Sequence, residues 1–492
     1  MKKRSRSRIY IIGAGFAGSS IAHEIRRKDV LGDVVAFLDD DPSKIGTRID
    51  DIPVLGPIAD VLTIVKTTPA DEALIAMPGA ARETLRTVFA QLEKAEFAKI
   101  RILPNISQII DGEAHLIQTR EIDPQDLLGR NPVQINLRKS LQYLRGKRVL
   151  ITGAGGSIGS ELARQLLSGG AERLYLLDHD ENSVYEIDRE LRLLQEEGVG
   201  ERATIVPVVG ELQDSDYMDY ILARLRADTV FHAAAHKHVP MMEANPVEAI
   251  KNNVFGTENL VRAAIAAGVG RFVLVSTDKV VEPRSIYGAS KRIAEQIVLG
   301  ADAPDSDFMV VRFGNVLASR GSIIPLFDQQ IRKGGPVTLT DPEVTRYFMT
   351  IGEAAALVLQ AGGIGTGGEL YILDMGEPVR IRDLAEQMIR FYGYEPDVDV
   401  AIEVVGMRPG EKLHERLFDD TERPEPTEHP RLLRVSGERV DSAAVSRLLD
   451  TLRPVCFRDR DRPDDYRNRS HLRSAVGAWI PTLESPVGEP AY

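Results

Sequence analysis

The chain has 492 residues, of which 43% are hydrophobic, so it is long enough for two or three domains with buried cores. Its formal net charge of −12 argues against a protein that binds nucleic acid through a basic surface. A single cysteine, Cys456, excludes an intrachain disulfide framework and a cysteine-rich zinc site, and it fits a reducing compartment such as the cytoplasm.

The chain starts with a basic stretch, Lys2–Arg8, followed by the short apolar run Ile9–Ile12. This start does not resemble a signal peptide. No apolar run approaches the roughly 18–20 residues that a spanning helix needs. We therefore expect no transmembrane segment in this chain and a cytoplasmic location. The basic start could touch anionic lipid at the inner face of the membrane, although a solvated tail is the simpler interpretation.

The first chemical signal is a strand, turn and helix pattern over residues 9–25. The strand Ile9–Ile12 leads into Gly-Ala-Gly-Phe-Ala-Gly at 13–18, a spacing that suits a tight turn, a phosphate on the backbone and close helix packing. A second strand, Val34–Leu38, ends in Asp39–Asp41, where an acid could bind a ribose hydroxyl. The pattern fits a nucleotide-binding domain, or a Rossmann-like domain that binds nothing tightly.

Further apolar runs extend this first unit. We predict strands at Glu72–Met77 and Arg101–Pro104, with an amphipathic helix over 81–98 between them. Residues 105–142 have shorter apolar runs and several turn residues, so they are interpreted as a partly folded connector between two domains.

A second Gly-rich unit begins at Gly146. The strand Arg148–Ile151 runs into a turn and helix start at which phosphates should lie on backbone amides. The next strand, Arg173–Leu177, ends in Asp178, at about the distance expected for a ribose-binding acid, although Asp178 could also be a plain helix cap. An acid there would repel a 2′-phosphate, so NAD is favoured over NADP. The turn and helix-start residues predicted to bind it are Gly153, Gly156, Ser157, Ile158 and Gly159.

Two later strands add cofactor candidates. The strand Thr204–Val209 is followed by Glu211 and Leu212, where an adenine could be hydrogen-bonded. The strand beginning at Thr229 ends in small residues that would let a cofactor pass closely, namely Ala233, Ala234 and Ala235. His236 and His238 then lie two positions apart; without a third ligand nearby we favour a sugar-nucleotide or packing role over a metal site.

Polar groups cluster where the predicted strand Phe272–Val275 ends, in Ser276-Thr277-Asp278-Lys279. Ligands bind at such strand ends in open α/β sheets. Tyr287 follows, with Lys291 four positions later on the same helical face. A nearby cation should lower the pKa of the tyrosine, which could then take a proton from a sugar hydroxyl as hydride leaves for NAD⁺. The alternative is a surface Tyr-Lys pair.

Five motifs now identify a resemblance. They are Thr-Gly-Ala-Gly-Gly-Ser-Ile-Gly-Ser-Glu (152–161), His-Ala-Ala-Ala-His-Lys-His-Val-Pro (232–240), Ser-Thr-Asp-Lys (276–279), Arg-Phe-Gly-Asn-Val (312–316) and Arg-Pro-Gly-Glu-Lys (408–412). In this order they resemble the extended short-chain dehydrogenase/reductases, and more closely the long-form (FlaA1/CapD-like) bacterial nucleotide-sugar 4,6-dehydratases of polysaccharide and glycan biosynthesis. Residues 37–42, Phe-Leu-Asp-Asp-Asp-Pro, resemble part of the extra N-terminal domain of the long members. Those members usually carry transmembrane helices ahead of it, and many have methionine in place of the relay tyrosine, which is Tyr287 here.

The resemblance implies a mechanism. Tyr287, assisted by Lys291, would take the C4 hydroxyl proton while hydride passes from C4 to NAD⁺, and Thr277 would hydrogen-bond the C4 oxygen. Lys279 would then remove the acidified C5 proton, and Asp278 would protonate the departing C6 hydroxyl. Hydride returns to C6, so NAD is regenerated. A strand-end ion pair is the alternative for Asp278 and Lys279.

The substrate side is assigned partly by motif and partly by residue type. The resemblance places Asn315 near the sugar nucleotide. Arg346 and Arg408 could hold the diphosphate, since arginine suits bidentate phosphate contacts. Glu411 could accept bonds from the uridine ribose, although exposed Arg and Glu are often only solvated. The complete predicted substrate set is His236, Lys237, Asn315, Ser322, Arg346, Arg408 and Glu411.

We therefore predict an α/β protein with two Rossmann-like, doubly wound parallel-sheet domains. Residues 1–135 would form the N-terminal domain with its connector. Residues 136–440 would form the catalytic domain with a smaller C-terminal substrate-binding part, and 441–492 a partly irregular tail in which Trp479 docks locally. The expected activity is NAD-dependent dehydration of UDP-N-acetylglucosamine or a related UDP-N-acetylhexosamine, in a homo-oligomer. The alternatives are a nucleotide-sugar 4-epimerase and a non-catalytic nucleotide-binding regulator.

Overall fold

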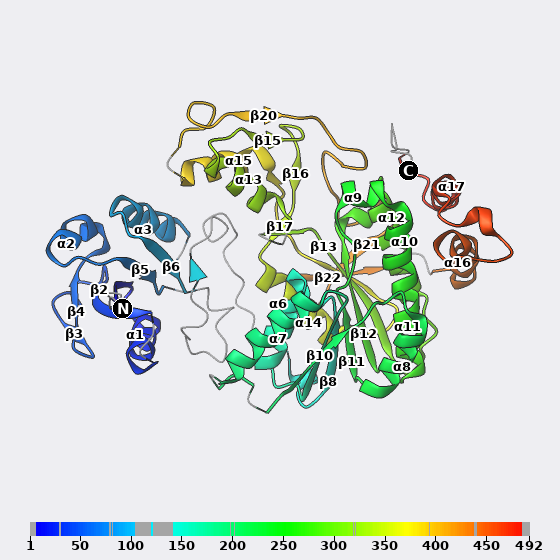
Figure 1. Ribbon diagram of the computed structural model, residues 1–492, viewed down its shortest axis with the longest axis horizontal. Helices are drawn as coiled ribbons and strands as arrows, with labels where there is room; N and C mark the ends of the chain where they lie inside the picture. The colour runs from blue at the N-terminus through cyan, green and yellow to red at the C-terminus, as the bar shows by residue number, and fades with distance from the viewer. Residues whose placement is uncertain are drawn as a thin grey trace, which may run out of the picture. The chain divides into compact units, whose positions relative to one another are not determined.

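The computed structural model forms two compact units, Met1–Ile135 and Asn136–Tyr492 (Figure 1). Most of the expected connector over 105–142, part of the basic start and the Pro78-Gly79 turn lie outside the described residues. Within the described part, no helix combines the length and apolar character needed to cross a membrane. The structure describes residues 6–28, 31–77, 80, 82–103, 120–121, 141–196, 198–200, 202–317, 319, 321–392, 394–436 and 440–484.

The N-terminal unit is a sheet with the strand order β3-β4-β2-β1-β5-β6-β7. Its five central strands run parallel, and the two edge strands β3 and β7 run antiparallel. Tyr10, Ile11 and Phe37 are fully buried, as expected for parallel strands covered on both faces. The elements are β1 Ser7–Ile12, α1 Phe16–Lys28, β2 Gly32–Leu38, β3 Arg48–Ile49, β4 Ile52–Gly56, α2 Val61–Thr67, β5 Glu72–Ile75, α3 Arg82–Lys94, β6 Lys99–Ile102 and β7 Arg120–Glu121.

The second unit is built on a sheet in the order β10-β9-β8-β11-β12-β13-β18-β22-β21. The first seven strands are parallel, and β22 and β21 close the sheet in the antiparallel direction. The predicted α/β, Rossmann-like class is confirmed. The strands are β8 Arg148–Thr152, β9 Arg173–Asp178, β10 Thr204–Val209, β11 Thr229–His232, β12 Arg271–Thr277, β13 Asp307–Phe313, β18 Leu370–Leu373, β21 Arg423–Pro426 and β22 Leu432–Ser436.

Helices cover both faces of this sheet (Figure 1). Phe272, Leu274 and Val310 point to one face and share a core with α8, α11 and α12. Val273 and Phe231 point to the other face, against Gly362 of α14. The helices are α6 Ser157–Ser168, α7 Glu181–Glu196, α8 Ser215–Leu225, α9 Val239–Ala244, α10 Pro246–Ile250, α11 Gly256–Ala266, α12 Ile286–Leu299 and α14 Ile351–Ile364.

A smaller lobe lies beyond the carboxyl ends of the parallel strands (Figure 1). It is made from three two-stranded sheets, β14 with β17, β15 with β20 and β16 with β19, together with two helices. This lobe corresponds to the expected substrate-binding part. Its elements are β14 Asn315–Val316, α13 Ile323–Arg332, β15 Val337–Leu339, β16 Thr345–Arg346, β17 Phe348–Met349, β19 Val379–Arg380, α15 Ile381–Phe391 and β20 Ile402–Val404.

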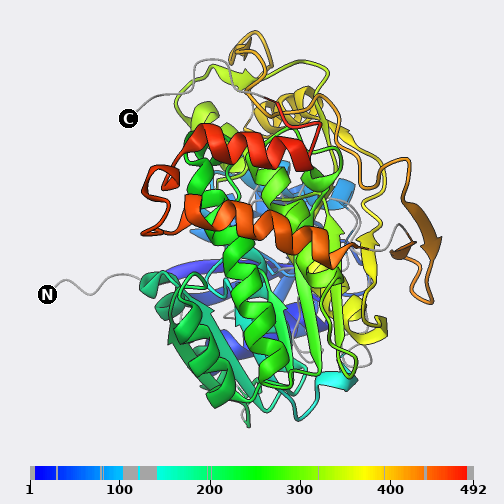
Figure 2. The ribbon, with the colours of Figure 1, turned by 90° about the vertical axis from the view of Figure 1, so that its right-hand side faces the viewer.

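The C-terminal segment differs from the expected tail. Two helices, α16 (Ser442–Cys456) and α17 (Arg469–Trp479), lie across the face formed by α10, α11 and α12 (Figure 2). Leu448 and Leu452 on α16, and Leu472 and Val476 on α17, recur at helical spacing and belong to the core of the second unit. The charged residues 458–465 are mostly exposed, as the sequence indicated. The segment is therefore part of the second unit and not a separate tail.

Candidate active site

The Gly-rich turn joins β8 to α6 at the carboxyl edge of the sheet. Gly153 has φ +67°, and a Cβ there would lie 2.7 Å from Ala234 Cα. A Cβ at Gly159 would lie 2.1 Å from Gly153 O, so both positions require glycine. Asp178 accepts the Gly155 amide at 3.0 Å through its Oδ2. The structure thus gathers the turn, the small residues after β11 and the acid that ends β9.

The remaining cofactor candidates have different surroundings. Glu211 is exposed just after β10. Leu212 is a core residue whose carbonyl accepts a hydrogen bond from Asn259 Nδ2 at 3.0 Å. His236, predicted on the substrate side, has its ring 6.3 Å from that of His179, which follows Asp178. His236 therefore lies close to the residue that follows β9, whereas the ring of His238 lies against Gly321.

The acid and base candidates meet directly after β12. Lys279 Nζ donates to Asp278 Oδ1 at 2.8 Å and to Asn315 Oδ1 at 2.9 Å, and Thr277 Oγ1 donates to the same Asp278 oxygen at 3.0 Å. Asp278 is fully buried, and its Oδ2 has no hydrogen-bond partner among the described residues. Burial lowers the pKa of Lys279, but the carboxylates of Asp278 and Glu415 outweigh it, and the pKa is raised.

Tyr287 and Lys291 lie one turn apart on α12, as the spacing indicated. Burial raises the pKa of Tyr287, and this effect is opposed by the charge of Lys279 and by a hydrogen bond with Thr277. Lys291 Nζ donates to Val275 O at 2.8 Å, and burial lowers its own pKa to about 8. The expectation that Lys291 lowers the pKa of Tyr287 is therefore contradicted in this structure. Helical spacing places the two side chains on the same face of the helix, but it does not determine which neighbouring group each of them contacts.

Some of the substrate-side candidates are held by hydrogen bonds within the chain, whereas others are exposed or have no hydrogen-bond partner in the described structure. Arg346 makes hydrogen bonds from its two Nη atoms to the carbonyls of Thr345, Lys412 and Leu413 and to Glu411. It therefore anchors the 411–413 loop and would have to exchange partners to hold a diphosphate. The Ser322 hydroxyl, at the start of α13, is buried with no hydrogen-bond partner in the described structure. Lys237 Nζ lies 3.5 Å from Ser319 Oγ, and Arg408 is exposed.

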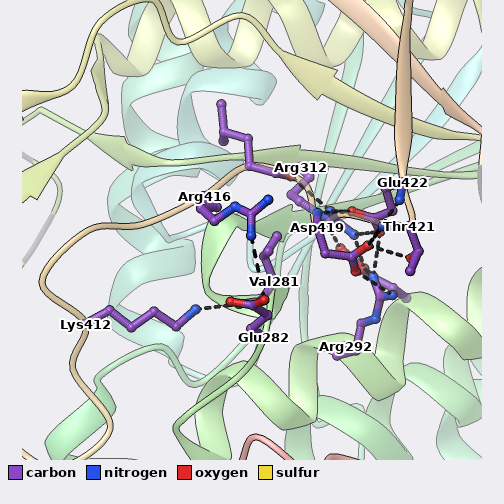
Figure 3. Close-up of polar contacts among 11 residues, drawn as sticks. Val281, Glu282, Arg292, Arg312, Lys412, Arg416, Asp419, Thr421 and Glu422 are labelled. Atoms are coloured by element: carbon purple, nitrogen blue, oxygen red, sulfur yellow. Dashed lines mark hydrogen bonds and ion pairs between the residues drawn. The ribbon is translucent and has the colours of Figure 1, made fainter.

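A buried ionic cluster forms around Arg312 and Glu422 (Figure 3). Arg312 is fully buried and is paired at 2.8 Å with both Glu295 of α12 and Glu422. Ser276 Oγ donates to Glu295 at 2.6 Å, which connects the cluster to the catalytic strand β12. Sequence reasoning assigned only Asn315 within this motif. The available signal was the arginine inside the otherwise apolar strand 308–313, because a buried arginine requires acidic partners.

Two charged residues near Lys279, the partly buried Lys412 and the buried Glu415, were also missed. Glu415 is 8% exposed, and its Oε2 lies 3.5 Å from Lys412 Nζ. The position of Lys412 in the 408–412 motif was noted, but nothing in the sequence indicated which backbone it would hold. In the structure Lys412 Nζ donates to Val281 O, two residues after Lys279.

Known proteins agree with this architecture. The model of the polysaccharide biosynthesis protein family matches residues 149–437, and the CoA-binding domain model matches residues 2–104. The capsular polysaccharide biosynthesis protein CapD of Staphylococcus aureus is 43% identical over 418 residues, which are 84% of this chain and 68% of CapD. The crystal structure of Pen from Bacillus thuringiensis is 32% identical, with a TM-score of 0.53, and covers 60% of this chain and 89% of its own.

Two classes of characterised relative match at similar identity. A UDP-N-acetylglucosamine 4,6-dehydratase (inverting) of Campylobacter jejuni is 31% identical, over 56% of this chain and 78% of the relative. A UDP-glucose 4-epimerase of Rickettsia rickettsii is also 31% identical, over 56% of this chain and 79% of the relative. The resemblance inferred from the five motifs is confirmed: the chain belongs to the CapD-like, long-form polysaccharide biosynthesis proteins, enzymes of the nucleotide-sugar dehydratase and epimerase kind within the extended short-chain dehydrogenase/reductase superfamily.

Proposed function

We propose that the second unit is an NAD-dependent UDP-N-acetylhexosamine 4,6-dehydratase, with UDP-N-acetylglucosamine as its first candidate substrate. The observation that carries the proposal is the contact of Lys279 with Asp278 next to Tyr287. Removal of water across C5 and C6 needs a base and an acid beside each other, whereas 4-epimerisation needs only the tyrosine relay at C4.

The Gly-rich turn fits a dinucleotide. The turn glycines leave no room for a Cβ at Gly153 or Gly159, and the α6 N-terminus with Ser157 and Ile158 presents backbone amides to a diphosphate. Asp178 would hold the adenosine ribose, and its charge favours NAD over NADP. Bound NAD⁺ would supply the hydride acceptor for C4 and, once reduced, the donor for C6.

The chain's own groups would manage the protons at C4. The Tyr287 oxygen would take the C4 hydroxyl proton, and the Thr277 hydroxyl would hold the C4 oxygen as it becomes a carbonyl. Lys291 can exchange a proton near neutral pH, because burial lowers its pKa to about 8. Lys291 could therefore pass a proton within the tyrosine relay, although its ammonium contacts Val275 O in this structure.

The elimination would use the other pair. Lys279 would first pass its proton to the Asp278 carboxylate that it contacts, a demanding step because the pKa of Lys279 is raised. Its neutral amine would then remove the C5 proton. Asp278 would deliver a proton to the C6 hydroxyl as the C6–O bond breaks, so water leaves as C5 and C6 become doubly bonded. One Asp278 oxygen is held by Lys279 and Thr277, which leaves Oδ2 as the oxygen that can exchange a proton.

The sugar nucleotide would lie on the lobe side. Asn315 and Lys237 lie near Lys279, and the Ser322 hydroxyl at the start of α13 has no hydrogen-bond partner among the described residues. We place the diphosphate near Lys237, Ser322 and Arg408, with Glu411 toward the uridine ribose. The N-terminal unit is proposed to bind a nucleotide-containing ligand, in keeping with its match to the CoA-binding domain model. A homo-oligomer located at the inner face of the membrane remains part of this proposal.

The test is incubation of the purified protein with UDP-N-acetylglucosamine and NAD, followed by mass spectrometry of the nucleotide sugar. A dehydratase gives a product lighter by one water, and Asp278→Asn abolishes it. A 4-epimerase gives a new sugar of unchanged mass, and Asp278→Asn leaves that conversion active. Bound NAD that never cycles with any UDP-sugar would favour a non-catalytic regulator.

A further inference from the structure

We infer that the C-terminal helix pair positions the start of α12, and with it Tyr287, by holding the loop that joins the two catalytic groups. This linking loop, residues 281–285, runs from the Asp278-Lys279 pair to Ile286, the first residue of α12. Its conformation sets where Tyr287 lies relative to Lys279. The inference deepens the proposed function and rests on it for its kinetic consequences.

The main contact is a relay from α17 to the first amide of α12. Arg473 Nη2 lies 3.1 Å from Glu243 Oε2, and the other carboxylate oxygen, Oε1, accepts the Ile286 amide at 2.6 Å. Glu243 is 8% exposed, so its charge depends on close partners. An amide in the first turn of a helix has no partner within the helix, and a carboxylate there also favours the helix dipole. Arg473 therefore orients a cap next to Tyr287.

The segment after α17 forms hydrogen bonds directly with the linking loop. Thr482 Oγ1 donates to Pro283 O at 2.8 Å, and the Glu484 amide donates to Arg284 O at 3.1 Å. The side chains of Arg284 and Glu484 also pair at 3.2 Å, although both are about half exposed and the pair adds little by itself. The two backbone carbonyls are fixed by residues about 200 positions later in the chain.

The opposite side of the linking loop is held by the 408–416 segment (Figure 3). Lys412 donates to Val281 O, and Arg416 lies 3.7 Å from Glu282. A Cβ at Gly410 would lie 2.7 Å from Ser285 Cβ, so the two backbones pack closely. The linking loop is therefore clamped between the substrate lobe and the C-terminal helices, with a catalytic group at each end.

This arrangement makes Arg473 a positioning residue for the C4 chemistry. The family match ends at residue 437, so Arg473 and Thr482 lie outside the matched range. When the contact from Arg473 through Glu243 to the Ile286 amide is broken, the start of α12 should open more often. Tyr287 would then be misplaced in a larger fraction of molecules, which should lower kcat without changing contacts to the UDP-sugar.

The experiment compares Arg473→Met with Arg453→Met in the full chain. Arg453 of α16 pairs with Glu258 of α11 at 2.7 Å, so it fastens the same helix pair without contacting the linking loop. Amide exchange of Ile286, measured without substrate, should speed up by roughly five- to ten-fold in Arg473→Met, the usual scale for losing a helix cap. It should not change in Arg453→Met. In the dehydratase assay, Arg473→Met should lower kcat several-fold and leave KM unchanged. Arg473→Lys should keep most of the wild-type kcat.

Unchanged Ile286 exchange, or equal effects of both substitutions, would overturn the inference. If Arg473→Met does not fold, Thr482→Val removes only the bond to Pro283 O and is expected to speed exchange of the linking-loop amides. Faster exchange in a protein whose wild type converts no UDP-sugar would support the positioning contact while refuting the proposed function. A wild-type dehydratase whose Arg473→Met variant keeps full kcat would refute the inference alone.

Discussion

The two Gly-rich units of this chain share one local design. Each first glycine has a positive φ, +103° at Gly13 and +67° at Gly153. A Cβ on the last glycine of each turn would overlap the carbonyl of the first, at 2.0 Å for Gly18 and 2.1 Å for Gly159. In both, the acid ending the second strand accepts an amide of the turn, at 2.7 Å in the N-terminal unit and 3.0 Å in the catalytic unit.

The units differ in what surrounds that design. Asp39 of the N-terminal unit is also paired with Lys44 at 3.1 Å, and hydrogen bonds with that partner and two amides outweigh burial and lower its pKa. The strand two places from β1, which is β6, runs on into the apolar Leu103, and β12 holds the same place relative to β8. In the catalytic unit β12 leads into Thr277, Asp278 and Lys279. A Gly-rich turn therefore identifies a fold, and the polar groups at later strand ends decide the chemistry.

The largest expected effect comes from removing a strand-end group that only the catalytic unit has. Lys279→Gln should lower kcat by about 10²- to 10⁴-fold, because a general base at C5 is lost. Leu103→Met, directly after β6, should leave kcat unchanged. Steady-state assays of both variants check the difference, and a Lys279→Gln enzyme that retains most of its turnover would contradict the assigned base.

The next prediction concerns stability, which a glycine substitution should lower by a similar amount in the two units. Gly18→Ala and Gly159→Ala each force a Cβ onto a carbonyl oxygen, so each should lower the free energy of unfolding of its own unit by roughly 1–3 kcal/mol. Only Gly159→Ala should weaken NAD binding. Denaturant unfolding together with NAD titration separates the two results. Loss of NAD affinity in Gly18→Ala would show that the N-terminal turn contributes to the same site.

A pH effect should distinguish the units through one buried histidine. His232 bonds Thr152 at 2.7 Å and Thr257 at 2.9 Å, whereas the N-terminal unit has Ile12 at the position of Thr152. Burial, helped by the charge of Lys291, lowers the His232 pKa to about 3. The unfolded chain binds this proton below about pH 6.5, so the stabilisation is complete above that pH and is lost as pH falls toward 3.

Between pH 6.5 and 5 this proton should cost the catalytic unit about 1–2 kcal/mol of unfolding free energy. Urea unfolding at the two pH values measures the change. His232→Gln should be less stable than wild type at pH 7 and should show a flatter decline with acid. An identical decline in His232→Gln would assign the acid sensitivity to other groups.

The smallest expected effect concerns the pH dependence of the base. The Glu415 carboxylate helps to raise the pKa of Lys279. Glu415→Gln removes that charge, so neutral Lys279 becomes available at lower pH. The rise of kcat/KM with pH should shift toward lower pH by less than about one unit, since Asp278 still acts on the ammonium. A shift toward higher pH would contradict this electrostatic picture.

Much of this molecule could be predicted from periodicity and turn chemistry. Buried strands such as Thr204–Val209, the two Gly-rich turns and the pairing of Tyr287 with the 276–279 cluster follow from local pattern and from the rule that ligands gather at strand ends. Local pattern does not specify long-range partners. The role of Arg346 as a loop anchor, the Arg312 pairing with Glu422 and the contact of Arg473 with Glu243 join positions far apart in the chain.

The C-terminal helices illustrate the same limit. Charged residues dominate 458–465, and this obscured the apolar spacing of Leu448, Leu452 and Val476 on either side. Helical periodicity was present in the sequence, but its packing surface, α10 to α12, is formed about 200 residues earlier. A pattern can indicate an amphipathic helix without indicating the surface that it covers.

The most direct test of the central claim is to follow UDP-N-acetylglucosamine with the purified protein and NAD in deuterated water, by mass spectrometry and proton NMR. The account predicts a 4-keto-6-deoxy product that has lost one water and carries deuterium at C5, because Lys279 removes the C5 proton and exchanges it with solvent. A product epimerised at C4, with its original mass and no deuterium at C5, would contradict it.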